Sequence, residues 1–248
     1  MAIKNILISQ KSPLNPAPYT ALTEKYGVNI SFHQFFLIEP LTSREFRAQR
    51  INPSDFSAIV FSSRHAIDAF FRLCEELRVK IPETMKYFCT TEAVAMYLQK
   101  HIVYRKRKIF FGKGTPESVM DAIGTKHKDE KFLITMSSET ANSERITKLF
   151  DKNGLDYASG VFIKPVSQDI KSLSLESYDM VVFYNPNDVK SLFENFPDFS
   201  QGRIKFISYG KSIVKAMKEA GLETEIEAPT PECPSVASAL KLYLETHK

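Results

Sequence analysis

Hydrophobic and polar positions follow the same order twice along the chain. An apolar run, a polar break and apolar residues at helical spacing make up residues 59–71, IVFSSRHAIDAFF, and the pattern returns at residues 181–193, VVFYNPNDVKSLF. Two further pairs of blocks match in the same order: residues 87–98 with 206–217, and residues 114–123 with 229–240. Matched blocks in one order indicate an internal duplication. Each block predicts a strand, a turn and a helix, so each copy is expected to form a small α/β domain with a parallel sheet.

The remainder of the chain predicts how the two domains are put together. Before the first copy, the pattern predicts a strand, a helix ended by Gly27 and one long strand over residues 28–38. The last copy has too few strands, and this N-terminal segment would complete it. We therefore expect a discontinuous domain of residues 1–37 and 167–248, with a domain of residues 38–166 inserted into it. Two extended segments lying side by side would join the domains, with an interdomain cleft as the binding site.

Composition narrows the class of protein. With 248 residues, 43% hydrophobic and 25% charged, the chain is typical of soluble globular proteins, and no apolar run approaches the roughly 20 residues that span a membrane. The N-terminus MAIKNILISQ predicts a first strand and no signal peptide. Three widely spaced cysteines show no metal-binding spacing and indicate a reducing compartment, so we expect the cytoplasm. A net charge of +4 suits an anionic small molecule better than nucleic acid.

The strand-to-helix turns carry most of the candidate binding residues. In α/β proteins these turns lie at the carboxyl ends of parallel strands, where ligands bind. The helix that follows each turn directs backbone N–H groups and a positive dipole end at an anion. Hydroxyl, amide and cationic side chains in the turns add further donors. These candidates are Ser62, Ser63, Arg64, His65, Thr91, Tyr184, Asn185, Tyr209, Gly210, Lys211 and Ser212.

Several of these residues also have a purely structural interpretation. Ser63, Asn185 and Ser212 are typical helix N-caps, and each fits that role alone as well as it fits ligand binding. His65 fits a solvated position as well as a ligand contact. No G-x-G-x-x-G follows the first strand, which argues against a dinucleotide site. The absence of an export signal argues against a periplasmic-type receptor.

The order and spacing of the motifs resemble the uroporphyrinogen-III synthase family over nearly the whole chain. The family's strand followed by Thr-Ser, a helix start and Val is similar to residues 61–67, FSSRHAI, and in the second half to residues 183–189, FYNPNDV. Its strand–Gly-x-x-Thr-Ala–helix motif is similar to residues 210–214, GKSIV, and its Pro-Thr motif before the last helix is similar to Pro229-Thr230.

The resemblance implies both a fold and a reaction. The fold has two α/β domains, one inserted in the other and joined by a two-stranded connection. The reaction is that of a cyclising lyase of haem biosynthesis, which closes the linear tetrapyrrole hydroxymethylbilane with inversion of the last pyrrole ring and loss of water. No metal or organic cofactor is implied, and a monomer is expected. The turns would then bind the substrate's eight carboxylates, and Ser212 or Tyr184 would hydrogen-bond the leaving oxygen.

Three departures from the family pattern leave an alternative open. Gln10 stands where the family often has arginine, and Thr91 and Val94 replace the glycine and threonine of the first-half Gly-x-x-Thr. Phe162 stands where the family often has a tyrosine that is thought to help catalysis, and we expect this position to contact substrate. The alternative is therefore a non-catalytic module on the same fold that binds a tetrapyrrole or another polyanion.

Overall fold

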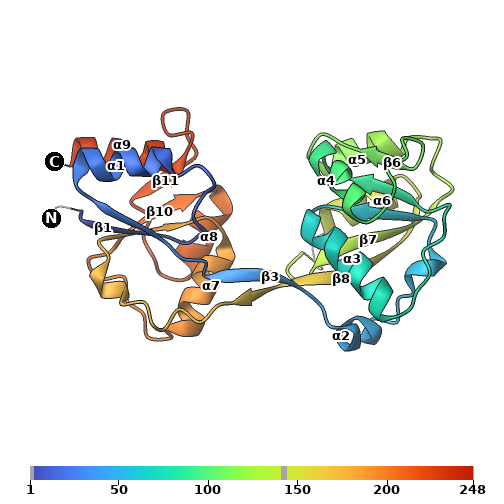
Figure 1. Ribbon diagram of the computed structural model, residues 1–248, viewed down its shortest axis with the longest axis horizontal. Helices are drawn as coiled ribbons and strands as arrows, with labels where there is room; N and C mark the ends of the chain where they lie inside the picture. The colour runs from blue at the N-terminus through green and yellow to red at the C-terminus, as the bar shows by residue number, and fades with distance from the viewer. Residues whose placement is uncertain (1–2, 141–143, 248) are drawn as a thin grey trace. The chain divides into compact units, whose positions relative to one another are not determined.

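The computed structural model describes residues 3–140 and 144–247 and divides the chain into two compact units. Unit 1 consists of Met1–Leu37 and Val166–Lys248, and unit 2 of Ile38–Pro165. The division expected from the sequence differs from this one only in the assignment of Val166. In Figure 1 each unit is a sheet with helices on both faces.

Unit 1 is built on a parallel sheet with strand order β11-β10-β9-β1-β2. Its strands are β1 (Asn5–Ile8), β2 (Asn29–Phe32), β9 (Met180–Phe183), β10 (Lys205–Tyr209) and β11 (Ile226–Ala228). Because β1 lies between β2 and β9, the N-terminal segment completes the sheet of the C-terminal third. All four residues of β9 are buried, as expected for a parallel strand covered on both faces.

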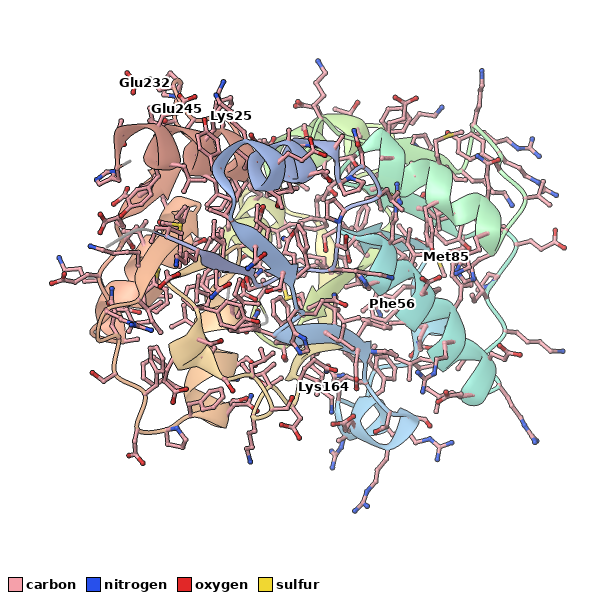
Figure 2. The ribbon with its side chains drawn as sticks, turned by 60° about the vertical axis from the view of Figure 1, so that its left-hand side comes forward. Lys25, Phe56, Met85, Lys164, Glu232 and Glu245 are labelled. Atoms are coloured by element: carbon pink, nitrogen blue, oxygen red, sulfur yellow. The ribbon has the colours of Figure 1, made fainter. Side chains whose placement is uncertain are left out.

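The helices of unit 1 cover the sheet in two pairs. They are α1 (Ala17–Tyr26), α7 (Pro186–Asn195), α8 (Lys211–Glu219) and α9 (Val236–Thr246), with a short 3-10 turn at Leu175–Ser177. Helices α1 and α9 lie side by side, and α7 contacts α8 (Figure 1). The Lys25 amino group on α1 lies 3.0 Å from the Glu245 carboxylate on α9, and the two labels lie close together in Figure 2.

Unit 2 repeats this plan with one additional strand. Its sheet has the order β3-β8-β7-β4-β5-β6, and β6, β5, β4, β7 and β8 pair in parallel. The strands are β3 (Phe36–Pro40), β4 (Ala58–Phe61), β5 (Lys86–Cys89), β6 (Ile109–Phe111), β7 (Lys131–Ser137) and β8 (Asp156–Ser167). The helices are α2 (Ser43–Ala48), α3 (Arg64–Glu76), α4 (Glu92–Tyr97), α5 (Pro116–Ile123) and α6 (Glu144–Lys152), with 3-10 turns at Pro53–Asp55 and Leu98–Lys100.

The register of the two sheets reproduces the sequence repeat residue by residue. In unit 2, Val60 pairs with Phe88 on one side and with Ile134 on the other. In unit 1, Val182 pairs with Ile207 and Ile8 in the same way. Both the predicted duplication and the mixed α/β fold with parallel sheets are therefore present. The positions that follow the strands are equivalent as well: Ser62 and Tyr184, Ser63 and Asn185, Thr90 and Tyr209, and Thr91 and Gly210.

Local sequence explains where the helices begin. The Ser63 hydroxyl accepts from Ala66 N at 3.1 Å, and the Thr91 hydroxyl accepts from Val94 N at 3.3 Å. The Asn185 side chain accepts from Asn187 N at 2.9 Å, and Pro186 occupies the first helical position. The predicted capping roles of Ser63 and Asn185 are confirmed, and each such cap stabilises the fold by about 1 kcal/mol.

Two predictions about the elements were wrong. Residues 28–38 do not form one strand, because β2 belongs to the first sheet and β3 to the second. Phe35, between them, is fully buried in unit 1 with its ring 5.9 Å from that of Phe183, and the bend that buries it interrupts the strand. Ser212 is not an N-cap, because α8 begins one residue earlier with Gly210 as its N-cap.

Candidate functional site

The carboxyl edge of the unit 1 sheet gathers six of the predicted site residues. Tyr184 and Asn185 follow β9, and Tyr209 and Gly210 end β10, the neighbouring strand. Lys211 and Ser212 occupy the first turn of α8, and both are exposed. The parallel pairing of β9 with β10 is what places these residues at one edge.

Asp188 organises the turn after β9. Its Oδ2 accepts hydrogen bonds from the Ser9 hydroxyl at 2.6 Å and from the backbone N–H groups of Tyr184 at 2.8 Å and Asn185 at 2.9 Å. Asp188 is fully buried, and its Oδ1 has no hydrogen-bond partner among the described residues. Burial raises the pKa of this carboxyl from 3.8 to about 6, against the opposing effect of its three donors.

Three tyrosines lie together beside this turn. The hydroxyl oxygens of Tyr19, on α1, and Tyr184 are 3.4 Å apart, and the rings of Tyr184 and Tyr209 are 5.2 Å apart at 43°. The Tyr209 hydroxyl donates to Pro234 O at 3.2 Å. Burial, followed by the contact with Tyr19, raises the pKa of Tyr184 well above its usual value. Tyr184 is therefore a neutral hydrogen-bond donor throughout the physiological pH range.

The N-terminus of α8 is a second feature of this edge. Gly210, its N-cap, has φ of +128°, a conformation that a residue with a Cβ rarely adopts. Glycine has no side chain with which to cap the helix, unlike Ser63, Thr91 and Asn185 in the other turns. The first-turn N–H groups of α8 and the adjacent Lys211 amino group therefore suit a carboxylate.

The carboxyl edge of the unit 2 sheet gathers the other predicted turn residues. Ser62, Ser63, Arg64 and His65 follow β4, and the neighbouring strand β5 leads to Thr91. The Thr90 hydroxyl donates to Ser62 O at 3.2 Å, which ties the two turns together. Ser62, Arg64 and His65 are exposed, whereas Ser63 and Thr91 are half-buried caps. The Arg64 guanidinium lies 5.4 Å from the centre of the Tyr97 ring.

The expectation for Phe162 was wrong. Its side chain is fully buried, with ring centroids 4.7 Å from Phe46 and 5.8 Å from Phe70. Phe46 belongs to α2, a helix that the sequence interpretation did not include. Because Phe162 lies inside the core of unit 2, it does not contact a ligand in this conformation. The site residues predicted from the sequence that remain candidates are those of the turns.

A cavity of about 550 Å³ lies elsewhere in unit 1. It is formed by segments that lead into β9 and β10, so it lies at the amino ends of these strands. None of the predicted site residues lines it. The volume of this cavity therefore does not identify the candidate site, which lies at the carboxyl edges of the sheets.

Sequence reasoning missed Ser9, Tyr19 and Asp188. Asp188 could have been predicted from the sequence. An acidic residue three positions after an N-cap residue often forms a capping box with it, as Asp188 does with Asn185. Ser9 and Tyr19 could not have been predicted, because only the pairing of β1 with β9 brings them to this edge. Within the described residues no group of three or more His, Cys, Asp and Glu side chains could hold a metal ion, and no helix is long and apolar enough to cross a membrane.

A comparison with known protein families finds a match that includes most of both units. The family model described as uroporphyrinogen-III synthase HemD matches residues 17–238, which include most of each unit. The chain belongs to the uroporphyrinogen-III synthase family. Members of this family are cyclising lyases of haem biosynthesis that act on a tetrapyrrole substrate, and that is the function of this chain.

Solved structures of uroporphyrinogen-III synthases share the fold. The synthetase of Helicobacter pylori 26695 is 16% identical, with a TM-score of 0.59 over 99% of this chain and 100% of that one. A mutant synthase of the extremely thermophilic bacterium Thermus thermophilus is 13% identical, with a TM-score of 0.52 over 98% of each chain. No curated protein sequence matches the chain significantly. At these identities the solved structures support the fold, and the family model supports the function.

Proposed function

We propose that this protein cyclises hydroxymethylbilane with inversion of the terminal pyrrole ring and loss of water, and that the two carboxyl edges bind the substrate. The observation that carries the proposal is the family match across both units, together with donor-rich turns at the carboxyl end of each sheet. A substrate with eight carboxylates requires N–H groups, hydroxyls and cations, and the two edges offer all three.

The carboxylates are proposed to bind the turn donors. At the unit 2 edge, Ser62, Arg64 and His65 present exposed donors above the N-terminus of α3. At the unit 1 edge, Lys211 and the N–H groups that follow Gly210 do the same for α8. A carboxylate at a helix N-terminus gains both hydrogen bonds and a favourable dipole interaction, typically about 0.3–1 kcal/mol for an exposed group.

Departure of the hydroxyl is proposed to depend on Tyr184 and Ser212. When the C–O bond of the hydroxymethyl group breaks, its electron pair stays on the oxygen, where negative charge develops. A neutral hydroxyl that donates to this oxygen stabilises the charge. Tyr184 keeps its proton because its pKa is raised, and a hydrogen bond from Tyr19 would leave that proton free for the substrate. Ser212 is exposed in the first turn of α8 and offers a second donor.

The test is a coupled cyclisation assay. Hydroxymethylbilane is generated by its synthase, this protein is added, and the oxidised porphyrins are separated by chromatography. Type III in excess of the protein-free control supports the proposal. Type I alone, the spontaneous product, from a folded protein that still binds tetrapyrrole would favour the non-catalytic binding module instead.

We also propose that the protein is a monomer, lies in the cytoplasm and binds no nucleic acid. Three buried free cysteines suit a reducing compartment, and a net charge of +4 is modest for a nucleic-acid-binding protein. Light scattering after size exclusion should give a mass near 28.3 kDa at micromolar concentration. A mass of twice that value would contradict the monomer.

A further inference from the structure

Four aromatic side chains lie at the unit 1 edge, and their rings have no role in the proposed function. Tyr184 follows β9, Tyr209 ends β10, Phe32 ends β2, and Tyr19 lies on α1. The Tyr19 ring lies 5.2 Å from Phe32 at 89°, and the Tyr184 ring lies 5.2 Å from Tyr209. We call these four residues the aromatic edge. All four are half-buried, so each ring keeps part of its surface accessible.

The duplication shows that the fold does not need these rings. The residue equivalent to Tyr184 in unit 2 is Ser62, and the residue equivalent to Tyr209 is Thr90. Unit 2 therefore ends the same pair of strands with small hydroxyl residues. At these two matching positions unit 1 has large rings where unit 2 has none, and they add apolar surface at the candidate ligand-binding edge.

The aromatic edge is also held in place by its own hydroxyl groups. The Tyr209 hydroxyl donates to Pro234 O, and the Tyr184 hydroxyl contacts that of Tyr19. Rings fixed in this way lose little conformational entropy when a ligand packs on them. Flat, electron-rich rings are suited to stacking or edge contacts with another flat ring.

Each edge presents a cationic side chain, but the side chains beside that cation differ. Near its exposed hydroxyl Ser62, the unit 2 edge presents Arg64 and His65, whereas the unit 1 edge has Lys211 beside the rings. A linear tetrapyrrole has two kinds of group to be recognised, carboxylates and pyrrole rings. Resting on the proposed function, we infer that the aromatic edge of unit 1 binds a pyrrole ring, while the turn donors of the unit 2 edge bind carboxylates.

The test separates the ring of Tyr209 from its hydroxyl. Tyr209→Thr installs the residue that unit 2 has at this position, and Tyr209→Phe keeps the ring. Aromatic stacking on a heteroaromatic ring is typically worth enough to change affinity about tenfold or more. We expect Tyr209→Thr to raise KM for hydroxymethylbilane about tenfold, and Tyr209→Phe, which keeps the ring but loses the hydrogen bond to Pro234 O, to raise it by a clearly smaller factor.

Tyr157 provides a matched control. It is half-buried, donates its hydroxyl to Asp151 at 2.9 Å and lies near the amino end of β8 in unit 2. Tyr157→Thr removes an equal ring at the opposite end of its own sheet from the carboxyl edge, so its KM should stay within about twofold. A KM increase in Tyr157→Thr as large as in Tyr209→Thr would overturn the inference, and so would equal effects of Tyr209→Thr and Tyr209→Phe.

A binding measurement keeps this inference distinct from the proposed function. Uroporphyrinogen III, kept reduced under anaerobic conditions, is titrated into each variant in a calorimeter. If the wild type binds it but makes no type III product, the proposed function fails, and the ratio of the Tyr209→Thr and Tyr209→Phe Kd values still decides the aromatic edge. If the wild type neither binds nor cyclises, both proposals are wrong.

Discussion

The hydroxyl oxygen of Tyr19 lies 3.4 Å from that of Tyr184, although 165 positions separate the two residues in the chain. The contact joins α1 of the N-terminal segment to the turn after β9. It exists because β1 pairs with β9, which brings the beginning of the chain to the candidate site.

Tyr19→Phe should lower kcat for cyclisation several-fold with little loss of stability. The substitution removes the hydrogen-bond partner that orients the Tyr184 hydroxyl. The lost bond is long and only partly buried, so the cost in unfolding free energy should stay below about 1 kcal/mol. Steady-state kinetics and urea denaturation measure the two effects. An unchanged kcat would show that Tyr184 does not depend on Tyr19.

Phe162→Tyr should destabilise the protein without changing the rate per folded molecule. The new hydroxyl would be buried among Phe46 and Phe70, where the neighbouring rings offer no acceptor, at a cost of about 1–3 kcal/mol. Phe162→Ala should cost about 3–5 kcal/mol by leaving a cavity. Denaturation curves and kcat of the folded fraction provide the measurements. A higher kcat in Phe162→Tyr would contradict this prediction and indicate that position 162 contacts the substrate.

Ser212→Ala should leave the unfolding free energy nearly unchanged, whereas Ser63→Ala should lower it. Ser212 is exposed and is not an N-cap, so its removal should change the unfolding free energy by less than about 0.5 kcal/mol and act only on turnover. Ser63→Ala removes a cap and should cost about 1 kcal/mol. Paired denaturation and kinetic measurements test both. A stability loss in Ser212→Ala equal to that in Ser63→Ala would indicate a structural role for Ser212.

The stability of the wild type should fall, relative to Asp188→Asn, as the pH rises from about 4 to 7. Burial raises the pKa of Asp188 from 3.8 to about 6 in the folded state, so the folded protein holds this proton more tightly than the unfolded chain. The resulting stability is fully present below the unfolded pKa and is lost as the pH passes the folded pKa. A shift of about two units corresponds to about 3 kcal/mol.

Urea denaturation at several pH values measures this difference, and Asp188→Asn is the control because it keeps the shape without the ionisation. Parallel stability curves for the wild type and Asp188→Asn would contradict the raised pKa. Ser9→Ala should increase the pH dependence further, because the Ser9 hydroxyl favours the charged carboxylate.

Local patterns in the sequence were sufficient where structure is decided locally. The caps at Ser63 and Asn185 depend on residues within three positions, and both were predicted. The repeat allowed the equivalence of Val60 and Val182 to be inferred before the sheets were known, because a duplicated strand keeps its register.

Long-range contacts could not be derived in the same way. The break at Phe35 depends on a core pocket built by Phe183, which lies far along the chain, and the alternation of apolar residues does not reveal it. Phe162 was placed in the site by resemblance alone, and the phenylalanines that enclose it come from α2 and α3. The Thr42–Glu45 capping box is a local signal for the start of α2, and it predicts that Phe46 lies in a helix.

The position of β1 between β2 and β9 has a consequence for synthesis on the ribosome. Lys4 N donates to Asp179 Oδ2 across 175 residues, and all of unit 2 is made between these two points. The strands of unit 2 are therefore complete first, and the first sheet closes only after β9 emerges. Until then the side of β1 that pairs with β9 has no partner strand from its own sheet. The interval before β9 emerges is therefore when this protein is most exposed to pairing with other nascent chains.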